Sequence, residues 1–393
     1  MKKPSLYDAL SQLDDNTEKK AFKYTNEFTK LVIQNRIPYN TQLELTPICN
    51  FNCKICYVHM TNENIIALGK SVMRFPQWKY YIDGLSDLGV MSFTITGGEC
   101  TIHPDFVEIY KYIYDKGKSI VIMTNASNIT DEILDLFVQK PPEKIKVTLY
   151  GASEETYKNF CGVDNAYNKV FTNIDRMLSK KLNVIFSYTV SKDNICDFEA
   201  LYEYAKSKAI KIQAENNLLN YNNSDSATVD ENSVLQSEYD EAERSYWKKS
   251  LKITDEEYEK RFLLRPFSTP HFDTQTKKGL TCAAGRSLLV VDWEGYLKPC
   301  NTMDVLKLDP KTEGGFEECW KKIVEFADNV PILEECEKCI FRLYCKLCAA
   351  RHYGDVGEFG KPSPRLCFKK KYPERAERLQ KIYDQMKANG EIE

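Results

Sequence analysis

The sequence predicts an α/β protein whose strand–helix units curve into a partial (β/α)6 TIM-like barrel, followed by a loop-rich cysteine domain. Three observations predict this fold. Strand and helix patterns alternate between residues 40 and 216, a C-x3-C-x2-C loop follows the first expected strand, and a second group of cysteines lies in the last third of the chain. Repeated strand–helix–strand units imply right-handed crossovers and a parallel sheet. The loops at the carboxyl ends of such strands form the active face.

Six apolar, β-branched runs are the expected strands of the barrel. They begin at Thr41, Ser92, Lys118, Lys144, Asn183 and Ile210. Helical patterns fill the intervals between them. The clearest begins at Pro104, a favourable first helical residue, and stops at Gly117. Another begins at Thr130, which can cap its amino end, and a third covers residues 170–181.

Outside the barrel the expected elements are less regular. Helical patterns cover residues 16–35, 238–262 and 372–387, and an Asn/Ser/Asp-rich stretch begins at residue 217. The last third is loop-rich with little periodicity, as expected where metals replace a hydrophobic core. The expected division is an N-terminal helical extension at 1–39, the barrel at 40–216, a bridging segment at 217–280, the cysteine-rich domain at 281–370 and a C-terminal helix at 371–393.

Composition excludes several classes of protein. Of 393 residues, 42% are hydrophobic and 28% are charged, which is ordinary for a globular chain of two or three domains. The net charge of −3 gives no electrostatic case for binding nucleic acid or an anionic membrane surface. No apolar run approaches the ~20 residues of a membrane span, and the polar start is not a secretory signal. We therefore expect a cytoplasmic protein whose fourteen cysteines serve metal or redox chemistry.

Cys49, Cys53 and Cys56 offer three thiolates from one short loop. Zinc and iron–sulfur clusters both take four ligands, so this loop leaves one coordination position open for chemistry. A structural zinc site would normally show paired C-x2-C knuckles, yet the next cysteine is Cys100. A disulfide framework is not expected in a long chain without a signal peptide. The spacing therefore favours an iron–sulfur cluster.

Two motifs together resemble those of the radical S-adenosylmethionine (SAM) enzymes. The first is the cysteine loop, in which Tyr57 holds the aromatic position that often follows the last cysteine. The second is Gly97-Gly98-Glu99 after the second strand, which is similar to the family's GGE motif. The resemblance implies a 4Fe–4S cluster on the three cysteines, with SAM bound to its open iron. Reductive cleavage of SAM yields methionine and a 5′-deoxyadenosyl radical, which takes a hydrogen atom from the substrate.

Further SAM contacts are expected on the same face. The two glycines of the motif let the backbone approach the ligand, and Glu99 or nearby carbonyls can accept hydrogen bonds from the SAM amino group. Thr148 matches a position where relatives place a Ser or Thr that reaches the ribose. Asn125 and Asn194 close two other strands, and turn residues that satisfy backbone groups are the alternative there. Many relatives carry an Arg-Gly pair where this chain has Phe160-Cys161-Gly162.

The second cysteine group resembles the SPASM extension of radical SAM maturases that act on peptides and proteins. That extension binds two auxiliary 4Fe–4S clusters. By the family's connectivity the ligands of the first are Cys282, Cys300 and Cys348, and those of the second are Cys336, Cys339, Cys345 and Cys367. The spacing before Cys348 is two residues where the usual pattern has three. A zinc knuckle is the alternative, but it would leave the cysteines at 282, 300 and 367 without a role.

The SPASM resemblance implies an oxidoreductase-type enzyme of peptide maturation. It would form a thioether or carbon–carbon crosslink in a ribosomally made peptide (RiPP), or epimerise a residue. A flavodoxin or ferredoxin would donate the electron. The about 40 residues before the first strand are too few for a fused leader-recognition domain. Either a separate partner binds the leader peptide or the enzyme lacks that requirement.

Two other functions are weighed against this one. An anaerobic sulfatase-maturating enzyme would carry a catalytic Asp where this chain has Asn301, which cannot act as a carboxylate base. An electron-transfer or binding protein would carry clusters without SAM chemistry.

Three remaining cysteines, Cys161, Cys196 and Cys319, carry no signal separable from core packing. Cys100, next to the GGE motif, could return a hydrogen atom to a substrate radical, as an epimerase needs. Filling space in the core is the alternative for that thiol. His59 lies close enough to the cysteine loop to line the site.

Overall fold

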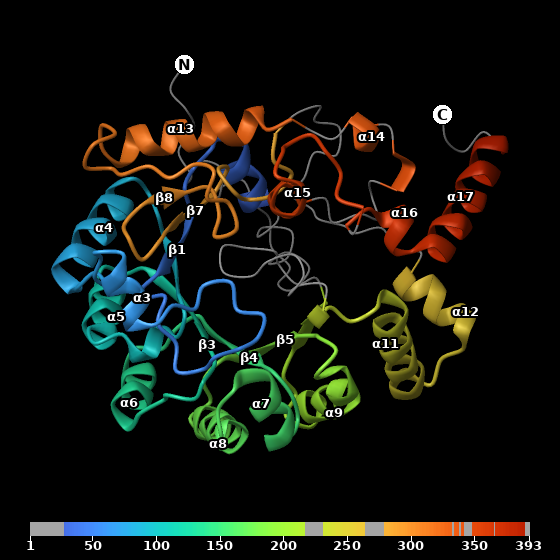
Figure 1. Cartoon of the computed structure of the whole chain (residues 1–393), viewed down its shortest axis with the longest axis horizontal. Coiled ribbons are helices and arrows are strands. Elements are labelled where there is room, and N and C mark those ends of the chain that lie inside the picture. The colour runs from blue at the N-terminus through green and yellow to red at the C-terminus, as the bar shows by residue number, and fades with distance from the viewer. Residues whose placement is uncertain are drawn as a thin grey trace, which may run out of the picture.

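The computed structural model describes residues 27–216, 231–263, 279–331, 334–337, 339–341, 348–364 and 366–389. They contain an eight-stranded sheet in the order β6-β5-β4-β3-β2-β1-β7-β8. Strands β1 to β6 run parallel, β7 pairs in parallel with the other side of β1, and β8 is antiparallel to β7. The sheet curves with helices outside it (Figure 1), which confirms the predicted partial (β/α)6 TIM-like barrel.

The six barrel strands begin within two residues of the predicted positions. They are β1 Asn40–Glu44, β2 Ser92–Thr96, β3 Ser119–Thr124, β4 Lys144–Leu149, β5 Val184–Thr189 and β6 Ile212–Glu215. Alternation decides which face each residue takes. In β4 the buried Ile145 and Val147 face the helices, and the half-buried Lys146 and Thr148 face the barrel interior.

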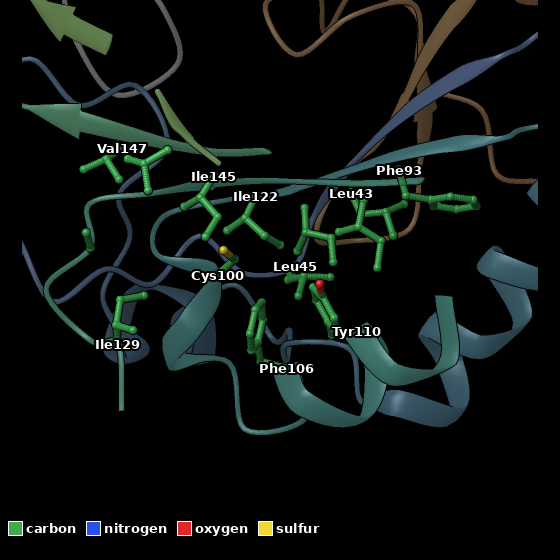
Figure 2. Packing of buried hydrophobic residues seen from close by; sticks show 14 of the residues in the cluster. Leu43, Leu45, Phe93, Cys100, Phe106, Tyr110, Ile122, Ile129, Ile145 and Val147 are labelled. Carbon is green, nitrogen blue, oxygen red and sulfur yellow. The ribbon is translucent and has the colours of Figure 1, made fainter. Parts of the chain in front are cut away.

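Helices cover the outer face of the sheet (Figure 1). They are α3 Asn62–Ala67, α4 Phe75–Asp87, α5 Phe106–Asp115, α6 Asp131–Gln139, α7 Glu154–Cys161, α8 Ala166–Ser179 and α9 Phe198–Ser207. Thr130 caps α6 as expected, because its hydroxyl accepts the N–H of Ile133 at 3.2 Å. Between sheet and helices lies one core, in which Phe106 and Tyr110 of α5 pack near Ile122 (Figure 2).

The helical pattern over 238–262 is broken into separate elements. They are α11 Gln236–Leu251, α12 Asp255–Tyr258 and the π-helical turn η3 Glu259–Leu263. Lys252 ends α11 in the left-handed conformation, with φ 54°. Thr254 then starts α12 through a capping box with Glu257. The prediction of a continuous helical stretch was therefore wrong at this break.

The last third has more regular structure than its sequence predicted. Its elements are β7 Leu288–Val291, β8 Leu297–Lys298, α13 Phe316–Asn329, α14 Glu334–Glu337, α15 Ala349–Val356, α16 Phe368–Lys371 and α17 Pro373–Ala388. Helix α13 buries Cys319, Trp320, Ile323 and Ala327 along one side, so it is an amphipathic helix in a segment expected to be loop. The predicted C-terminal helix at 372–387 is confirmed as α17.

The segments expected at the two ends of the barrel are only partly described. Residues 27–34 are helical, and the earlier part of the predicted 16–35 helix lies outside the described residues, as do 217–230 and 264–278 of the predicted bridging segment. Strand β7 belongs to the expected cysteine-rich domain at 281–370, yet it extends the barrel sheet. The expected division into domains stays a prediction. None of the helices in the described ranges is long and apolar enough to cross a membrane.

The C-terminal third contacts the barrel at both edges. At the β1 edge, α13 packs on α4, where the ring of Phe316 lies against Gly84. Gly295 of the β7–β8 turn lies against the hydroxyl of Tyr81, also in α4. At the β6 edge, Arg351 of α15 pairs with Glu215, N to O 3.6 Å. The described part of the last third therefore reaches from one edge of the open sheet to the other.

The substitution Gly84→Ala tests the α4–α13 contact. A Cβ at this position would lie 2.1 Å from a ring carbon of Phe316. We expect Gly84→Ala to lower the free energy of unfolding in urea by about 1–3 kcal/mol through overpacking. Combining it with Phe316→Leu should recover part of that loss, because the smaller side chain leaves room. An ordinary helical glycine would instead gain up to about 1 kcal/mol on replacement by alanine, and that result would contradict the contact.

Candidate functional site

The cysteine loop follows β1 directly and lies at the carboxyl end of the barrel strands. Two of its sulfurs receive backbone hydrogen bonds: Cys49 Sγ accepts the N–H of Phe51 at 3.4 Å, and Cys56 Sγ accepts the N–H of His59 at 3.3 Å. Burial raises the pKa of the Cys49 thiol to about 12, although the Phe51 N–H opposes the rise. A metal that binds here must therefore displace a proton from sulfur.

Cys53 makes a contact that the sequence did not signal. The neighbouring thiol of Cys161, together with burial, raises the pKa of Cys53. The N–H of Asn52 also donates to the carbonyl of Cys161 at 2.8 Å, so the middle of the loop is docked on the end of α7. No three His, Cys, Asp or Glu side chains in the described ranges are arranged as metal ligands. The donor set of three thiols on one loop nevertheless has the chemistry of an iron–sulfur site.

The GGE motif packs its backbone against the segment that leads from β1 into the cysteine loop. A Cβ on Gly97, which has φ +136°, would lie 2.4 Å from the carbonyl oxygen of Thr46, and a Cβ on Gly98 would lie 2.3 Å from that of Ile48. The N–H of Gly98 donates to the Thr46 carbonyl at 2.6 Å. Glycine is therefore required here by neighbouring backbone, whether or not a ligand approaches.

Glu99 is fully buried, and its carboxylate is saturated by protein groups. One oxygen accepts hydrogen bonds from the N–H and hydroxyl of Thr101 at 3.1 and 2.6 Å and from the Thr124 hydroxyl at 2.7 Å. The other accepts the N–H of Asn125 at 2.7 Å. Burial raises the pKa of Glu99, and these donors oppose the rise. The Glu99 side chain therefore joins the end of β2 to the end of β3. Because its oxygens already accept these hydrogen bonds, nearby carbonyls are favoured over this carboxylate as acceptors for the SAM amino group.

Asn125 lies beside the cysteine loop. Its side-chain amide donates to Asn50 Oδ1 at 3.0 Å and lies 3.7 Å from Cys49 Sγ. Asn50 in turn donates to the hydroxyl of Ser127 at 2.7 Å. The structure therefore brings this predicted residue to the first cysteine.

Two other predicted residues are placed differently. Thr148 is half-buried on the inner face of β4, next to Ser187 of β5. Asn194 is fully buried and donates to the carbonyls of Tyr150 and Thr189 at 3.0 and 2.9 Å. Those contacts match the turn-residue alternative for Asn194.

Cys100 lies in the hydrophobic core near Phe106, Ile122 and Ile145 (Figure 2). It is fully buried, and its thiol donates to the carbonyl of Met123 at 3.4 Å. This position matches the packing alternative, and its role as a hydrogen donor stays a prediction.

The cysteines that the resemblance assigns to the first auxiliary cluster, Cys282, Cys300 and Cys348, lie near one small hydrophobic cluster in the C-terminal third. Cys300 and Cys348 pack against that cluster, which contains Ala284, two residues after the exposed Cys282. Burial raises the pKa of Cys300, and the nearby Cys348 thiol adds to the rise. Cys348, whose spacing departs from the usual pattern, therefore lies near Cys300.

The second C-terminal set is only partly visible. The N–H of Cys339 donates to the carbonyl of Cys336 at 3.3 Å, and Cys367 precedes α16. Cys345 lies outside the described residues.

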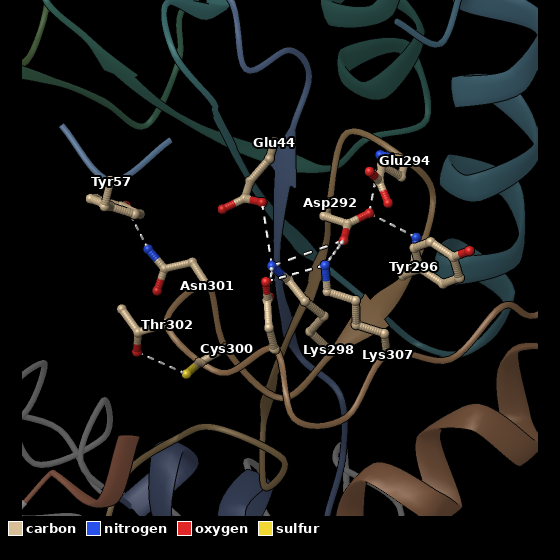
Figure 3. A network of polar contacts seen from close by, with 11 residues as sticks. Glu44, Tyr57, Asp292, Glu294, Tyr296, Lys298, Cys300, Asn301, Thr302 and Lys307 are labelled. Atoms are coloured by element: carbon tan, nitrogen blue, oxygen red, sulfur yellow. Dashed lines mark hydrogen bonds and ion pairs between the residues drawn. The ribbon is translucent and has the colours of Figure 1, made fainter. Parts of the chain in front are cut away.

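A polar network joins the cysteine loop to the C-terminal third (Figure 3). The amide of Asn301, next to Cys300, donates to the hydroxyl of Tyr57 at 2.9 Å. Glu44, the last residue of β1, lies 3.7 Å from Lys298 of β8. Sequence reasoning missed Glu44, although an acid at the end of a buried strand is a signal that could have found it.

Comparisons with known proteins cover both the barrel and the C-terminal third. Residues 43–205 match the radical SAM superfamily. The AdoMet-dependent heme synthase of Methanosarcina barkeri is 24% identical over 355 residues, which are 86% of this chain and 99% of that protein. The antilisterial bacteriocin subtilosin biosynthesis protein AlbA of Bacillus subtilis is 24% identical over 67% of this chain and 55% of its own length.

Solved structures extend the likeness into the C-terminal third. Streptococcus suis SuiB bound to SAM aligns with a TM-score of 0.63 and 14% identity over 89% of this chain and 83% of SuiB. SuiB bound to precursor peptide SuiA aligns with a TM-score of 0.63 and 12% identity over 88% and 80%. At these identities the comparison shows a shared fold.

The substitution Gly97→Ala tests the backbone contact beneath the cysteine loop. Its Cβ would collide with the Thr46 carbonyl, so we expect a loss of roughly 3–4 kcal/mol in the free energy of unfolding. Gly89→Ala is the matched control, because Gly89 also has positive φ, +107°, but nothing within 4 Å of its Cβ. The control should lose only about 1–2 kcal/mol. Equal losses in urea unfolding would show that conformational strain, not the close contact, selects glycine at residue 97.

Proposed function

Residues 43–205 of this chain are a radical SAM domain, and on that premise we propose that the protein is a radical SAM enzyme with auxiliary iron–sulfur clusters that modifies a peptide. The observation that carries the proposal is that Cys300 and Cys348 pack against one small hydrophobic cluster, which includes Ala284, two residues after Cys282. These cysteines are connected to the cysteine loop through Asn301 and Tyr57. Three thiols beside the active end of a radical SAM barrel are suited to a cluster that serves the substrate.

The residues that would hold the cofactors lie at the carboxyl ends of the strands. Cys49, Cys53 and Cys56 would hold the 4Fe–4S cluster that binds SAM, and together these groups supply a 5′-deoxyadenosyl radical when bound. The chain itself provides the cradle: the GGE backbone and Asn125 position the loop. Thr148 faces the interior, where it can meet the nucleoside.

The auxiliary ligands proposed are those expected from the sequence. Cys282, Cys300 and Cys348 would hold the first cluster. The second would take Cys336, Cys339, Cys345 and Cys367. Asn301 holds Tyr57 by a hydrogen bond and has no carboxylate, which ranks sulfatase-type maturation below peptide crosslinking or epimerisation.

Relatives support a peptide as substrate. AlbA takes part in subtilosin biosynthesis, and SuiB has been solved with precursor peptide SuiA. A flavodoxin or ferredoxin as electron donor, a separate leader-binding protein and a cytoplasmic location complete the proposal.

A second candidate is a heme-synthase-type reaction on a tetrapyrrole. The observation that favours it is the relative from Methanosarcina barkeri, which aligns over 99% of its own length. The two candidates share the radical SAM domain and differ in the substrate that the barrel interior must admit.

Co-expression with the small open reading frames of the neighbouring locus tests the leading proposal. A mass change of −2 in a peptide, which is the loss of two hydrogens, would indicate a crosslink. A mass that is unchanged in ordinary water, with deuterium taken up when the reaction runs in deuterated water, would indicate epimerisation. Unchanged peptides, together with a shifted absorption spectrum of added iron coproporphyrin, would replace this proposal by the second candidate.

The auxiliary clusters predict the iron content of single variants. Cys348→Ala should lower the iron of the anaerobically purified protein by up to about four atoms per chain, because a 4Fe–4S cluster loses a thiolate ligand. Cys196→Ala removes an exposed thiol and serves as the matched control. Its iron content should equal that of the wild type. Unchanged iron in Cys348→Ala, or zinc in place of iron, would contradict the assignment.

A further inference from the structure

Five charged side chains, three of them buried, form a cluster where β1, β7 and β8 meet (Figure 3). We call it the charge cluster; its members are Glu44, Asp292, Lys298, Asp304 and Lys307. Three carboxylates against two ammonium groups leave a net charge of −1 when all are ionised. Buried charges are costly unless they are paired and hydrogen-bonded.

Two of the three acids are used by the scaffold. Asp292 Oδ1 accepts the N–H groups of Glu294 and Tyr296 at 3.1 and 2.9 Å, which shapes the turn between β7 and β8. Asp304 accepts a hydrogen bond from Lys298 at 2.9 Å and pairs with Lys307 at 3.2 Å. Direct contacts therefore offset the burial of Asp292 and hold the half-buried Asp304 in place.

Glu44 is held less tightly than these two acids. It is 5% exposed, its nearest ammonium, Lys298 Nζ, lies 3.7 Å away, and no described residue donates a hydrogen bond to it. Leu43 and Leu45 pack into the core outside the sheet, so the alternation of β1 places Glu44 on the inner face. A carboxylate that accepts no hydrogen bond from the described residues, on the face that lines the barrel, is available to a ligand.

The neighbours of Glu44 at the active end cannot accept a proton. Burial, with the nearby charge of Glu44, raises the pKa of Tyr57, so this phenol stays neutral. Asn301 bears an amide, which donates to Tyr57 and has no basic site. Among these three side chains, Glu44 is the acid–base group.

The electrostatic surroundings suit Glu44 to proton exchange. Burial raises its pKa to about 7. Lys298 opposes the rise, Asp292 and Asp304 add to it, and Lys307 opposes it weakly. A carboxyl group whose pKa lies near the working pH can both take up and release a proton during turnover.

We propose that Glu44 accepts the proton that the reacting group of the substrate gives up. The inference rests on the proposed function. When a thioether forms, a C–H and an S–H bond break and a C–S bond forms. The hydrogen atom would pass to the 5′-deoxyadenosyl radical, and the S–H proton would pass to the Glu44 carboxylate. The remaining electron would pass to an iron–sulfur cluster, which Cys282, Cys300 and Cys348 would hold.

The product formed per 5′-deoxyadenosine measures this role, because general structural damage would lower both quantities together. In the holoenzyme with the co-expressed peptide, Glu44→Gln should lower this ratio at least about 100-fold, the usual contribution of a general base. The wild-type rate should fall as the pH drops below about 7, because a protonated Glu44 cannot accept. The acid limb is this fall of the rate at low pH. The proposal would be overturned if Glu44→Gln kept both the wild-type ratio of product to 5′-deoxyadenosine and an unchanged acid limb.

Asp304→Asn is the matched control within the charge cluster. It removes one negative charge next to Glu44 and keeps the shape of the side chain. Since Asp304 raises the pKa of Glu44, its loss should move the acid limb of the rate to lower pH while product still forms. If Glu44→Gln and Asp304→Asn both lost the acid limb, the pH dependence would belong to the charge cluster as a whole, which would count against Glu44.

Infrared titration of the holoenzyme tests Glu44 without a substrate. The carbonyl band of a protonated carboxyl group should disappear as the pH rises through about 7, and Glu44→Gln should lack this change. Identical titrations of the two proteins between about pH 5 and 9 would overturn the inference. If the wild type modifies no peptide, the proposed function fails, and the infrared titration alone then decides whether Glu44 exchanges a proton.

Discussion

The close backbone contact between Gly97-Gly98 and the Thr46-to-Ile48 segment is the constraint on which the active end of this barrel depends. Carbonyl oxygens fill the space that a Cβ would need at either glycine. Because the segment joins β1 to the cysteine loop, the contact fixes where the loop starts relative to β2. Glu99 follows at once and ties β2 to β3 with a saturated carboxylate. The first three strands therefore end as one unit, from which the cysteines project.

The C-terminal third is built onto the same unit. Strand β7 pairs with the free side of β1, and α13 packs on α4 through Phe316 and Gly84. At the far edge, Arg351 meets Glu215. The cysteines at 282, 300 and 348 therefore lie on segments anchored to the barrel sheet. The hydrogen bond from Asn301 to Tyr57 connects this set of cysteines to the cysteine loop. Strand β1 supports both sets of cysteines.

The barrel was predictable because its signals are local. Each strand shows its own apolar run, and caps such as Thr130 mark helix starts. The misses have a common physical cause: they depend on partners distant in the sequence. In the sequence of helix α13, four buried residues are interspersed with charged ones, so its apolar side is recognised only against its partners. The contact of Cys161 with Cys53 and the burial of Glu44 against β8 exist only once the chain has folded. The site motifs were found because their spacing is itself local.

The pairing of β1 with β7 has a consequence for biosynthesis. Strands β1 and β7 lie side by side in the sheet, yet most of the chain separates them in sequence. While the ribosome makes the protein, β1 can pair only with β2 and remains an edge strand until β7 has emerged. The cysteine loop is therefore complete long before the C-terminal third can cover it. A nascent chain halted between β6 and β7 would present an open barrel, a stage at which delivery of iron and sulfide to the loop meets no obstruction from the last third.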